Sequence, residues 1–272
     1  MPALPTPRLV SAADLMRMRP HAPVPRAVRR FVAAAILFGC TEPAFALRPF
    51  DATDAAVAAP QEFELELGPL GRLREGSRRI RVAPAVIGNF GLSGNRELVI
   101  EGRREVAIDR DSSERASAIV DNGLFIKQVL REGVMQEQGG VSIATEYGML
   151  LPGVHADRGT GASIAGIVSQ RWNAVTIHLN AVAAYTRDHN PDLFLSTIVE
   201  GPESWRVRPV AEVFVDEARG HPHVISGLIG AIWRVTEGLA FDVGIRSARS
   251  GNEAIRELRV GLTWALSWSK QP

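Results

Sequence analysis

Charged side chains recur at every second or fourth position in several segments, and they are the residues best placed to do chemistry. Glu97 and Glu101 share one parity of an alternating segment. Arg206, Arg208 and Glu212 do so in a later segment. Because successive side chains of a strand point to opposite faces, each set predicts a polar stripe on one face of a sheet. Around a closed sheet, such stripes either line a polar path or fill the interior with ion pairs.

The same polar parity contains further candidates for a pore lining. Glu212, Asp242 and Arg246 are the strongest, because they fall on strands close together in the sequence and rings of charge bias permeation through wide pores. The alternative, in which the charges only fill the interior, stays open. The remaining candidates are Glu146, His178, Glu257 and Arg259.

Motifs for catalysis or metal binding are weak. A lone His-x-His pair, His221 and His223, is a poor metal-binding signal by itself. Ser226 near His223 is the nearest approach to the nucleophile and base that an outer-membrane lipid hydrolase would need. No Gly-x-Ser-x-Gly motif or phosphate-binding glycine loop accompanies them. The sequence therefore predicts neither an enzyme nor a bound metal or cofactor.

The first 46 residues differ from the rest of the chain. Basic residues precede an apolar run over 31–39, and Ala-Phe-Ala follows it. This order predicts a secretory signal peptide cleaved between Ala46 and Leu47, with 1–15 as an extension if translation starts later. The apolar run is too short to span a membrane as a helix, for which about 20 residues are needed.

A second interpretation of the leader makes Cys40, at the end of Leu-Phe-Gly-Cys, the lipid-carrying first residue of a lipoprotein. Either way the chain is exported. Residues 47–272 contain 25 basic and 28 acidic side chains, a net charge of −3, which does not favour a nucleic-acid partner. Cys40 is the only cysteine, so a chain beginning at Leu47 can form no disulfide.

Period-two alternation extends through the rest of the chain and predicts about twelve strands. In the last segment, Leu258 and Val260 alternate with Glu257 and Arg259. Clusters of glycine, proline and asparagine separate the segments. Several segments reach the roughly 9 to 11 residues that a tilted transmembrane strand needs. The predicted strands are 62–67, 78–88, 96–109, 122–131, 140–150, 162–171, 173–185, 193–200, 205–216, 223–234, 239–248 and 255–268.

This pattern predicts an all-β fold, an antiparallel transmembrane barrel of about twelve strands, rather than a soluble sandwich. A membrane barrel exposes an apolar band with aromatic residues near its edges, whereas a sandwich buries its apolar faces. With the leader, it predicts the outer membrane of a Gram-negative bacterium, with outer-membrane lipid and the barrel assembly machinery as partners. The aromatic belt is expected to contain Tyr185, Trp205, Trp233, Trp264 and Trp268.

Four segments carry a resemblance to a known family. They read RPVAEVF over 208–214, GAIW over 230–233, LAFDVG over 239–244 and RVGLTW over 259–264. In these segments the chain resembles the outer-membrane barrels of the MetA-pathway phenol-degradation family, which are described as transporter-like. The resemblance covers 205–268 and continues back to about residue 62 as strand pattern only. It implies a barrel more strongly than it implies a substrate.

The expected organisation is a signal peptide over 1–46, a periplasmic segment over 47–61, a barrel over 62–268 and a tail over 269–272. The tail departs from the usual barrel ending, since four residues follow Trp268. The function predicted first is a channel or transporter-like barrel for a small solute, hydrophobic or aromatic in character. The alternatives are a structural or adhesive barrel with a plugged lumen and, less favoured, the lipid hydrolase.

Overall fold

The computed structural model of the chain describes residues 49–75, 78–108 and 117–268. The predicted signal peptide, its cleavage site between Ala46 and Leu47, the alternative lipid site at Cys40 and the tail over 269–272 lie outside these residues.

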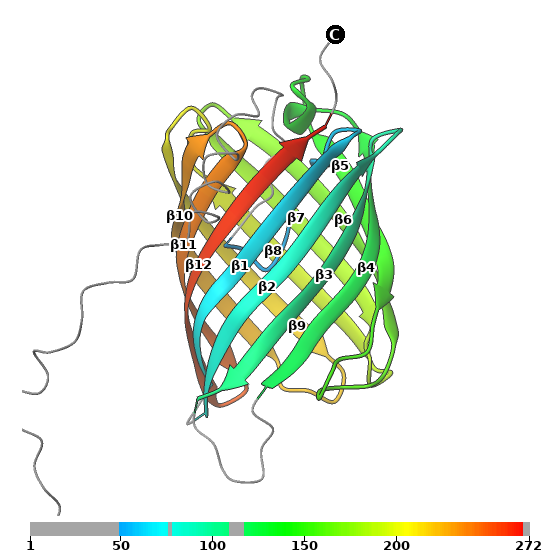
Figure 1. The fold of residues 1–272 in the computed structure, drawn as a ribbon, viewed down its shortest axis with the longest axis vertical. Coiled ribbons are helices and arrows are strands. Elements are labelled where there is room, and N and C mark those ends of the chain that lie inside the picture. The colour runs from blue at the N-terminus through cyan, green and yellow to red at the C-terminus, as the bar shows by residue number, and fades with distance from the viewer. Residues whose placement is uncertain (1–48, 76–77, 109–116, 269–272) are drawn as a thin grey trace, which may run out of the picture. The chain divides into compact units, whose positions relative to one another are not determined.

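Twelve strands form a closed barrel in which every strand pairs antiparallel with its sequence neighbours and β1 pairs with β12 (Figure 1). This confirms the predicted all-β class and strand number. The strands are β1 (Glu62–Glu75), β2 (Arg78–Leu92), β3 (Arg96–Ala107), β4 (Ser117–Arg131), β5 (Ser142–Leu150), β6 (Gly161–Trp172), β7 (Val175–Tyr185), β8 (Pro191–Glu200), β9 (Val207–Ala218), β10 (Val224–Thr236), β11 (Leu239–Ser250) and β12 (Glu253–Ser267).

The two ends of the barrel can be told apart by the register. Glu62, which begins β1, pairs with Ser267, which ends β12, so both strands meet at one rim, here called the terminal end. The opposite rim, here called the distal end, carries the connection over 151–160 and the turns after β7, β9 and β11. A short 3-10 helix, η2 (Val134–Gln136), lies in the terminal-end connection between β4 and β5. No helix among the described residues is long and apolar enough to cross a membrane.

The first strand is longer than predicted. The prediction ended it at Leu67, because Gly68 and Pro69 are turn-forming residues, but β1 continues to Glu75. The register against β12 shifts between Leu67 and Leu70. A proline has no backbone N–H to donate to the ladder, so the irregularity accommodates it and pairing resumes beyond it.

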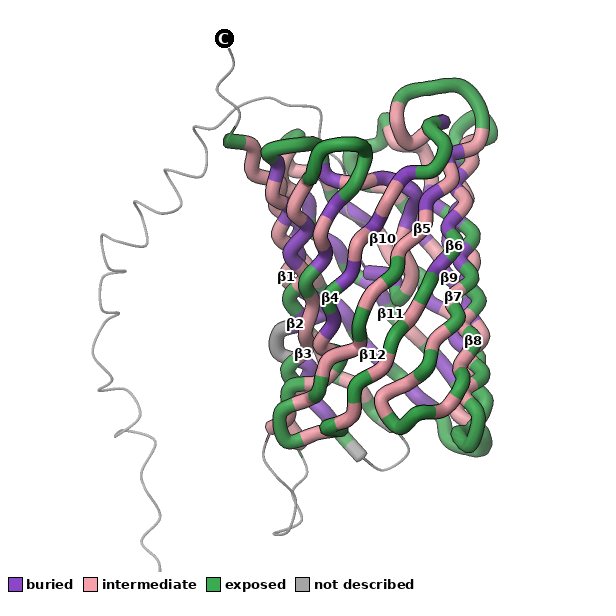
Figure 2. Tube along the Cα trace, turned by 90° about the vertical axis from the view of Figure 1, so that its right-hand side faces the viewer, coloured by how far each residue is buried: buried purple, intermediate pink, exposed green. Residues whose placement is uncertain are grey.

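The wall is apolar outside, and its buried charged side chains point inward. Along β12, the inward Glu257 and Arg259 are 3% and 1% exposed, whereas the outward Leu258 and Val260 are 50% and 41% exposed. Figure 2 shows this alternation of buried and exposed positions along the strands. Such an arrangement is the reverse of a soluble domain and suits a barrel whose outer surface faces lipid.

All five tryptophans of the chain lie toward the terminal end. Trp205 is in the connection before β9, and the others are near the terminal ends of β6, β10 and β12. Four of them are about half exposed, and Trp264 is partly buried. Tyr185 instead ends β7 at the distal end and stacks on the His189 ring. The role of these residues as a belt at the membrane interface stays a prediction.

Candidate functional site

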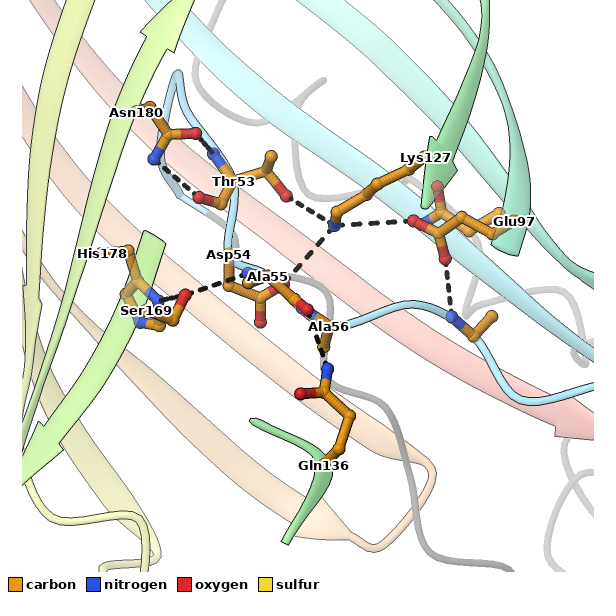
Figure 3. Close-up of polar contacts among 12 residues, drawn as sticks. Thr53, Asp54, Ala55, Ala56, Glu97, Lys127, Gln136, Ser169, His178 and Asn180 are labelled. Carbon is orange, nitrogen blue, oxygen red and sulfur yellow. Dashed lines mark hydrogen bonds and ion pairs between the residues drawn. The ribbon is translucent and has the colours of Figure 1, made fainter. Parts of the chain in front are cut away.

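A segment that precedes β1 lies inside the barrel. We call residues 49–61 the strap. The sequence assigned 47–61 to a periplasmic segment, but its described part crosses the lumen and hydrogen bonds to the wall (Figures 1 and 3). Small alanine side chains allow the strap backbone to approach the wall, and inward carboxylates and amides supply partners for its N–H groups.

The strap begins on β9 and β12. Glu212 of β9 accepts hydrogen bonds from the backbone N–H groups of Asp51 and Ala52, at 2.8 and 3.0 Å. Arg259 of β12 donates to the Pro49 carbonyl oxygen at 2.8 Å and to Asp51 Oδ1 at 2.9 Å. Hydrogen bonds to charged groups contribute about 1.5–3 kcal/mol each, so these residues anchor the strap firmly.

Behind this anchor lies a second layer of charge. Glu257 Oε2 accepts from Arg259 Nε and from Arg246 Nε, both at 2.9 Å. The Arg246 guanidinium also lies 3.9 Å from Asp51 Oδ2. Glu257 and Arg246 therefore hold Arg259 in the orientation that reaches the strap.

The centre of the strap is held from opposite sides (Figure 3). Asn180 of β7 accepts from the Thr53 N–H at 3.4 Å and donates to the Thr53 carbonyl at 2.8 Å. From the other side, Lys127 Nζ of β4 donates to Thr53 Oγ1 at 3.1 Å and lies 3.5 Å from both Asp54 Oδ1 and Glu97 Oε1. These contacts compensate the buried charge of Lys127, and they leave one negative charge of the carboxylate pair unbalanced.

The next strap residue, Ala55, rests on a serine–histidine pair. Its N–H donates to Ser169 Oγ at 3.0 Å, and Ser169 Oγ lies 2.8 Å from His178 Nδ1. His178 Nε2 is 3.8 Å from Glu200 Oε1. These groups resemble a hydrolytic triad only in composition, because Ser169 is fully buried and its oxygen already accepts from the strap. Their role in the structure is to support the strap.

The strap then reaches the rim. The Ala58 N–H donates to Glu97 Oε2 at 2.6 Å and the Ala59 N–H donates to Glu62 Oε2 at 2.9 Å. Gly91 of β2 permits this passage, because a Cβ atom there would lie only 1.8 Å from the Ala59 carbonyl oxygen. The residue must therefore be glycine for the strap to pass this closely.

The strap divides the lumen into two unlike sides. On what we call the packed side, the lumen face of β8–β12, strap residue Phe50 joins a buried apolar cluster with Ile198, Val210, Leu228, Ile232 and Ala240. On what we call the open side, the lumen face of β1–β5, the wall borders a cavity of about 500 Å³. The cavity also extends along β6–β8 to Arg187, Asp192 and Asp216 near the distal rim.

The predicted pore-lining residues fall into four groups. Glu97, Glu212 and Arg259 bind the strap directly, and Glu257, Arg246 and His178 support it. Glu101 and Glu146 line the cavity. Of the rest, Arg208 contacts Glu200 at 3.0 Å and Asp242 is buried against Gly261, whereas Arg206 is exposed in the turn before β9 rather than on the polar stripe.

Several residues of the site were not singled out from the sequence: Lys127, Gln136, Ser169, Asn180, Glu62, Glu64 and Glu66. One signal was available for Lys127, since only two lysines occur in the chain. The three glutamates of β1 alternate with Phe63 and Leu65. This alternation indicated a polar face on the strand but did not indicate which residues the glutamates contact. Gln136, which donates to the Ala55 carbonyl at 2.8 Å, carried no signal because it lies in a connection.

The weak catalytic and metal motifs are not assembled in the structure. His223 contacts Glu217, and Ser226 Oγ is buried without a hydrogen-bond partner among the described residues. His221 contacts Asp188 at 2.7 Å instead of converging with His223 on a common point. In the described part of the chain, no group of three or more His, Cys, Asp or Glu residues is placed to hold a metal ion.

Comparison with known proteins identifies the fold. No family model and no curated protein matches the chain. The COG4313 outer membrane channel from Pseudomonas putida F1 is similar in structure, with a TM-score of 0.56 and 8% identity over 80% of this chain and 98% of that one. The KdgM porin in complex with disordered oligogalacturonate gives 0.51 and 6% over 75% and 98%. The chain thus has the β-barrel fold found in bacterial outer-membrane channels.

Proposed function

We propose that this chain is an outer-membrane channel of a Gram-negative bacterium for a small solute, closed at rest by the strap. The observation that carries the proposal is the cavity of about 500 Å³ that ends at a strap held without covalent bonds. Cavities of this size accommodate small molecules. The apolar outer wall and the fold support a place in the outer membrane, with its lipid and the barrel assembly machinery as partners.

The cavity wall supports a solute with an apolar or aromatic body. Phe50, Phe125 and Phe194 all contribute to the lining, together with aliphatic residues. Aromatic rings favour partners that can stack or pack against their faces. The resemblance of 205–268 to the MetA-pathway phenol-degradation family points in the same direction.

This proposal places the terminal end, where β1 begins and β12 ends, at the periplasm. The strap then closes the periplasmic half of the path, and the cavity opens toward the distal, extracellular rim. Glu212, Asp242 and Arg246, which the sequence favoured as determinants of selectivity, lie on β9 and β11 of the packed side. We therefore assign them to closure rather than to selection.

The strap contacts also favour a second function, a structural or adhesive barrel whose lumen is permanently plugged. Glu212, Arg259 and Lys127 hold the strap from three strands, which is sufficient for a permanent plug. The two functions differ in one respect: a channel requires that the strap can leave its place.

A reversible cross-link distinguishes them. The Ala55 N–H lies 3.0 Å from Ser169 Oγ, so Ala55→Cys with Ser169→Cys places two thiols close together in a mature chain without other cysteines. In planar bilayers we expect no conductance while the disulfide is intact and channel openings after reduction. Ser169→Cys alone, which should not respond to reductant, is the control. Absence of conductance in the reduced pair, in the control and in the native protein would favour the plugged barrel.

A further inference from the structure

The lining of the cavity carries an excess of negative charge. Among the described residues that border it, ten are acidic and four are basic. A cluster of carboxylates enclosed by a low-dielectric wall attracts cations and repels anions. The distribution of the four basic residues decides how much of this charge remains uncompensated.

The basic residues are already engaged. Lys127 contacts Asp54 and Glu97, as described above, and Arg259 is held by Asp51 and Glu257. Neither of these two cations has a described contact with Glu64 at the inner end of the cavity, although the charge of Lys127 acts on Glu146.

The other two cations lie nearer the distal rim. Arg103 Nη2 contacts Asp121 at 2.8 Å, and Arg187 donates to the backbone carbonyls of Leu151 and Asn122, both at 2.7 Å. Neither arginine has a described contact with the deeper carboxylates of Glu64 and Glu146.

Glu64 of β1 is the least compensated of these groups. It lies close enough to Glu66, Glu97 and Asp54 for their charges to act on it, and it is 2% exposed. Its Oε2 has no hydrogen-bond partner among the described residues, whereas Oε1 of Glu66 accepts from Asn89 Nδ2 at 2.9 Å. A buried carboxylate oxygen without a partner is costly, and a bound ligand that supplies the missing partner is one explanation for it.

The surroundings of Glu64 define the chemistry of an occupant. Glu146 of β5 also borders the cavity and lies within electrostatic reach of both Lys127 and Glu66. Ile87, Val99 and Phe125 provide an apolar wall in the same cavity. An ammonium group forms short, strong hydrogen bonds with carboxylates, and an aromatic ring face attracts a cation. An inorganic cation would use the carboxylates but gain nothing from the apolar wall.

We infer that the inner end of the cavity binds a small organic amine, with its ammonium group at Glu64 and its apolar body against Ile87, Val99 and Phe125. This inference rests on the proposed function, because it names the class of solute that the channel admits. Glu66 and Glu146 complete the negative surface around the ammonium group. An anion of the same size is excluded by the same residues.

Three probes with one phenyl ring and different charge test the inference on the folded native barrel in detergent. Isothermal titration would compare 2-phenylethylammonium, 2-phenylethanol and phenylacetate. We expect the ammonium probe to bind at least ten-fold more tightly than the alcohol, and phenylacetate not to bind. Equal binding of the three probes, or tighter binding of the alcohol, would overturn the inference. Loss of ammonium binding in the presence of equimolar sodium would instead indicate an inorganic cation site.

A pair of matched variants locates the site. Glu64→Gln should weaken binding of 2-phenylethylammonium ten-fold or more, while Glu237→Gln, the same change on an exposed terminal-end turn, should leave it unaltered. Gel mobility before and after boiling reports whether each variant is folded. If Glu64→Gln does not assemble, the probe series on the native protein tests the amine site by itself.

Conductance without preference for the amine would reject the amine site and leave the proposed channel function standing. Amine binding without conductance in any variant would reject the channel alone.

Discussion

On the packed side of the barrel, Phe50 of the strap completes an apolar cluster with side chains from β8, β9, β10 and β11. On the open side, the same kind of strand encloses a cavity whose lining has ten acidic and four basic residues among the described ones. The outer wall is alike on both sides, since outward Val260 and Ile100 are 41% and 45% exposed. The comparison teaches that membrane insertion depends on the outer face of every strand, whereas the inner faces hold the strap by apolar packing on one side and by hydrogen bonds and ion pairs on the other.

The largest effect should come from removing the aromatic ring that joins the strap to the packed side. Phe50→Ala should destabilise the strapped state by about 3–5 kcal/mol, because it leaves a cavity among buried apolar residues. Phe125→Ala is the matched change on the open side and should cost less, since Phe125 already borders a cavity. Urea unfolding followed by tryptophan fluorescence, together with bilayer conductance, measures both effects.

Only Phe50→Ala should raise conductance, because only that ring belongs to the strap. If Phe125→Ala opened the channel as readily, the distinction between the two sides would have no functional meaning. If Phe50→Ala changed neither stability nor conductance, the cluster would not be what retains the strap.

The outer wall provides a second test, in which the two sides should behave alike. Val260→Arg on β12 and Ile100→Arg on β3 each place a charge on the lipid-facing surface. Near the middle of a bilayer this costs about 2–4 kcal/mol. We expect both to lower the folded fraction in lipid vesicles by similar amounts, with Val260→Leu and Ile100→Leu as controls. A large cost at one position alone would show that the other does not face lipid.

The wall could be predicted from the sequence because its signal is local. Alternation such as Glu257-Leu258-Arg259-Val260 is repeated in strand after strand, and hydrogen bonding between neighbours then requires a closed sheet. All twelve predicted ranges overlap the observed strands, with errors mainly at the ends. The one long miss, β1 beyond Leu67, arose because a Gly-Pro pair interrupts the alternation without ending the strand.

The strap could not be predicted because its contacts are not local. Residues 49–61 have no period that fits a strand or a helix, and the partner of Asp51 is Arg259, 208 positions later. A weaker signal for the packed side was present in β10. Leu228 and Ile229 are adjacent and both apolar, so each face of this strand carries an apolar side chain. Carboxylates on the inward parity were predicted, but whether they bind a strap or line a cavity depends on the closed barrel.

The point where the strap leaves the lumen offers a third, smaller test. Gly91→Ala places a methyl group 1.8 Å from the Ala59 carbonyl oxygen, so the strap must shift. Overpacking of this kind costs about 1–3 kcal/mol. Gly166→Ala is the control, because a Cβ there meets nothing within 4 Å. We expect more frequent channel openings in Gly91→Ala alone, recorded as open probability in bilayers. Equal open probability in both variants would mean that this end of the strap does not control closure.

The smallest effect concerns exposed charges at the distal rim, where no strap is present. His221 Nε2 lies 2.7 Å from Asp188 Oδ2, between the turns that follow β9 and β7. The hydrogen bond and the negative charge of Asp188 raise the pKa of His221 above its ordinary value of 6.5. Hydrogen bonds from Thr186, His221 and Asn190 lower the pKa of Asp188 below its ordinary value of 3.8.

The sign of the pH dependence follows from these two directions. Because the pKa of His221 is raised on folding, the contact is fully present below about 6.5 and is lost as the pH rises through the raised value. Because the pKa of Asp188 is lowered, the contact persists above 3.8 and is lost only under more acidic conditions.

In Asp188→Asn, the NMR titration midpoint of His221 should fall toward 6.5, whereas Asp157→Asn on another distal connection should leave it unchanged. The stability of the barrel should not change measurably in either variant, because both partners are exposed to water and the pair is screened. An unaltered midpoint in Asp188→Asn would show that the two turns do not touch in solution, and a large loss of stability would show that the distal rim contributes more to the fold than its exposed contacts imply.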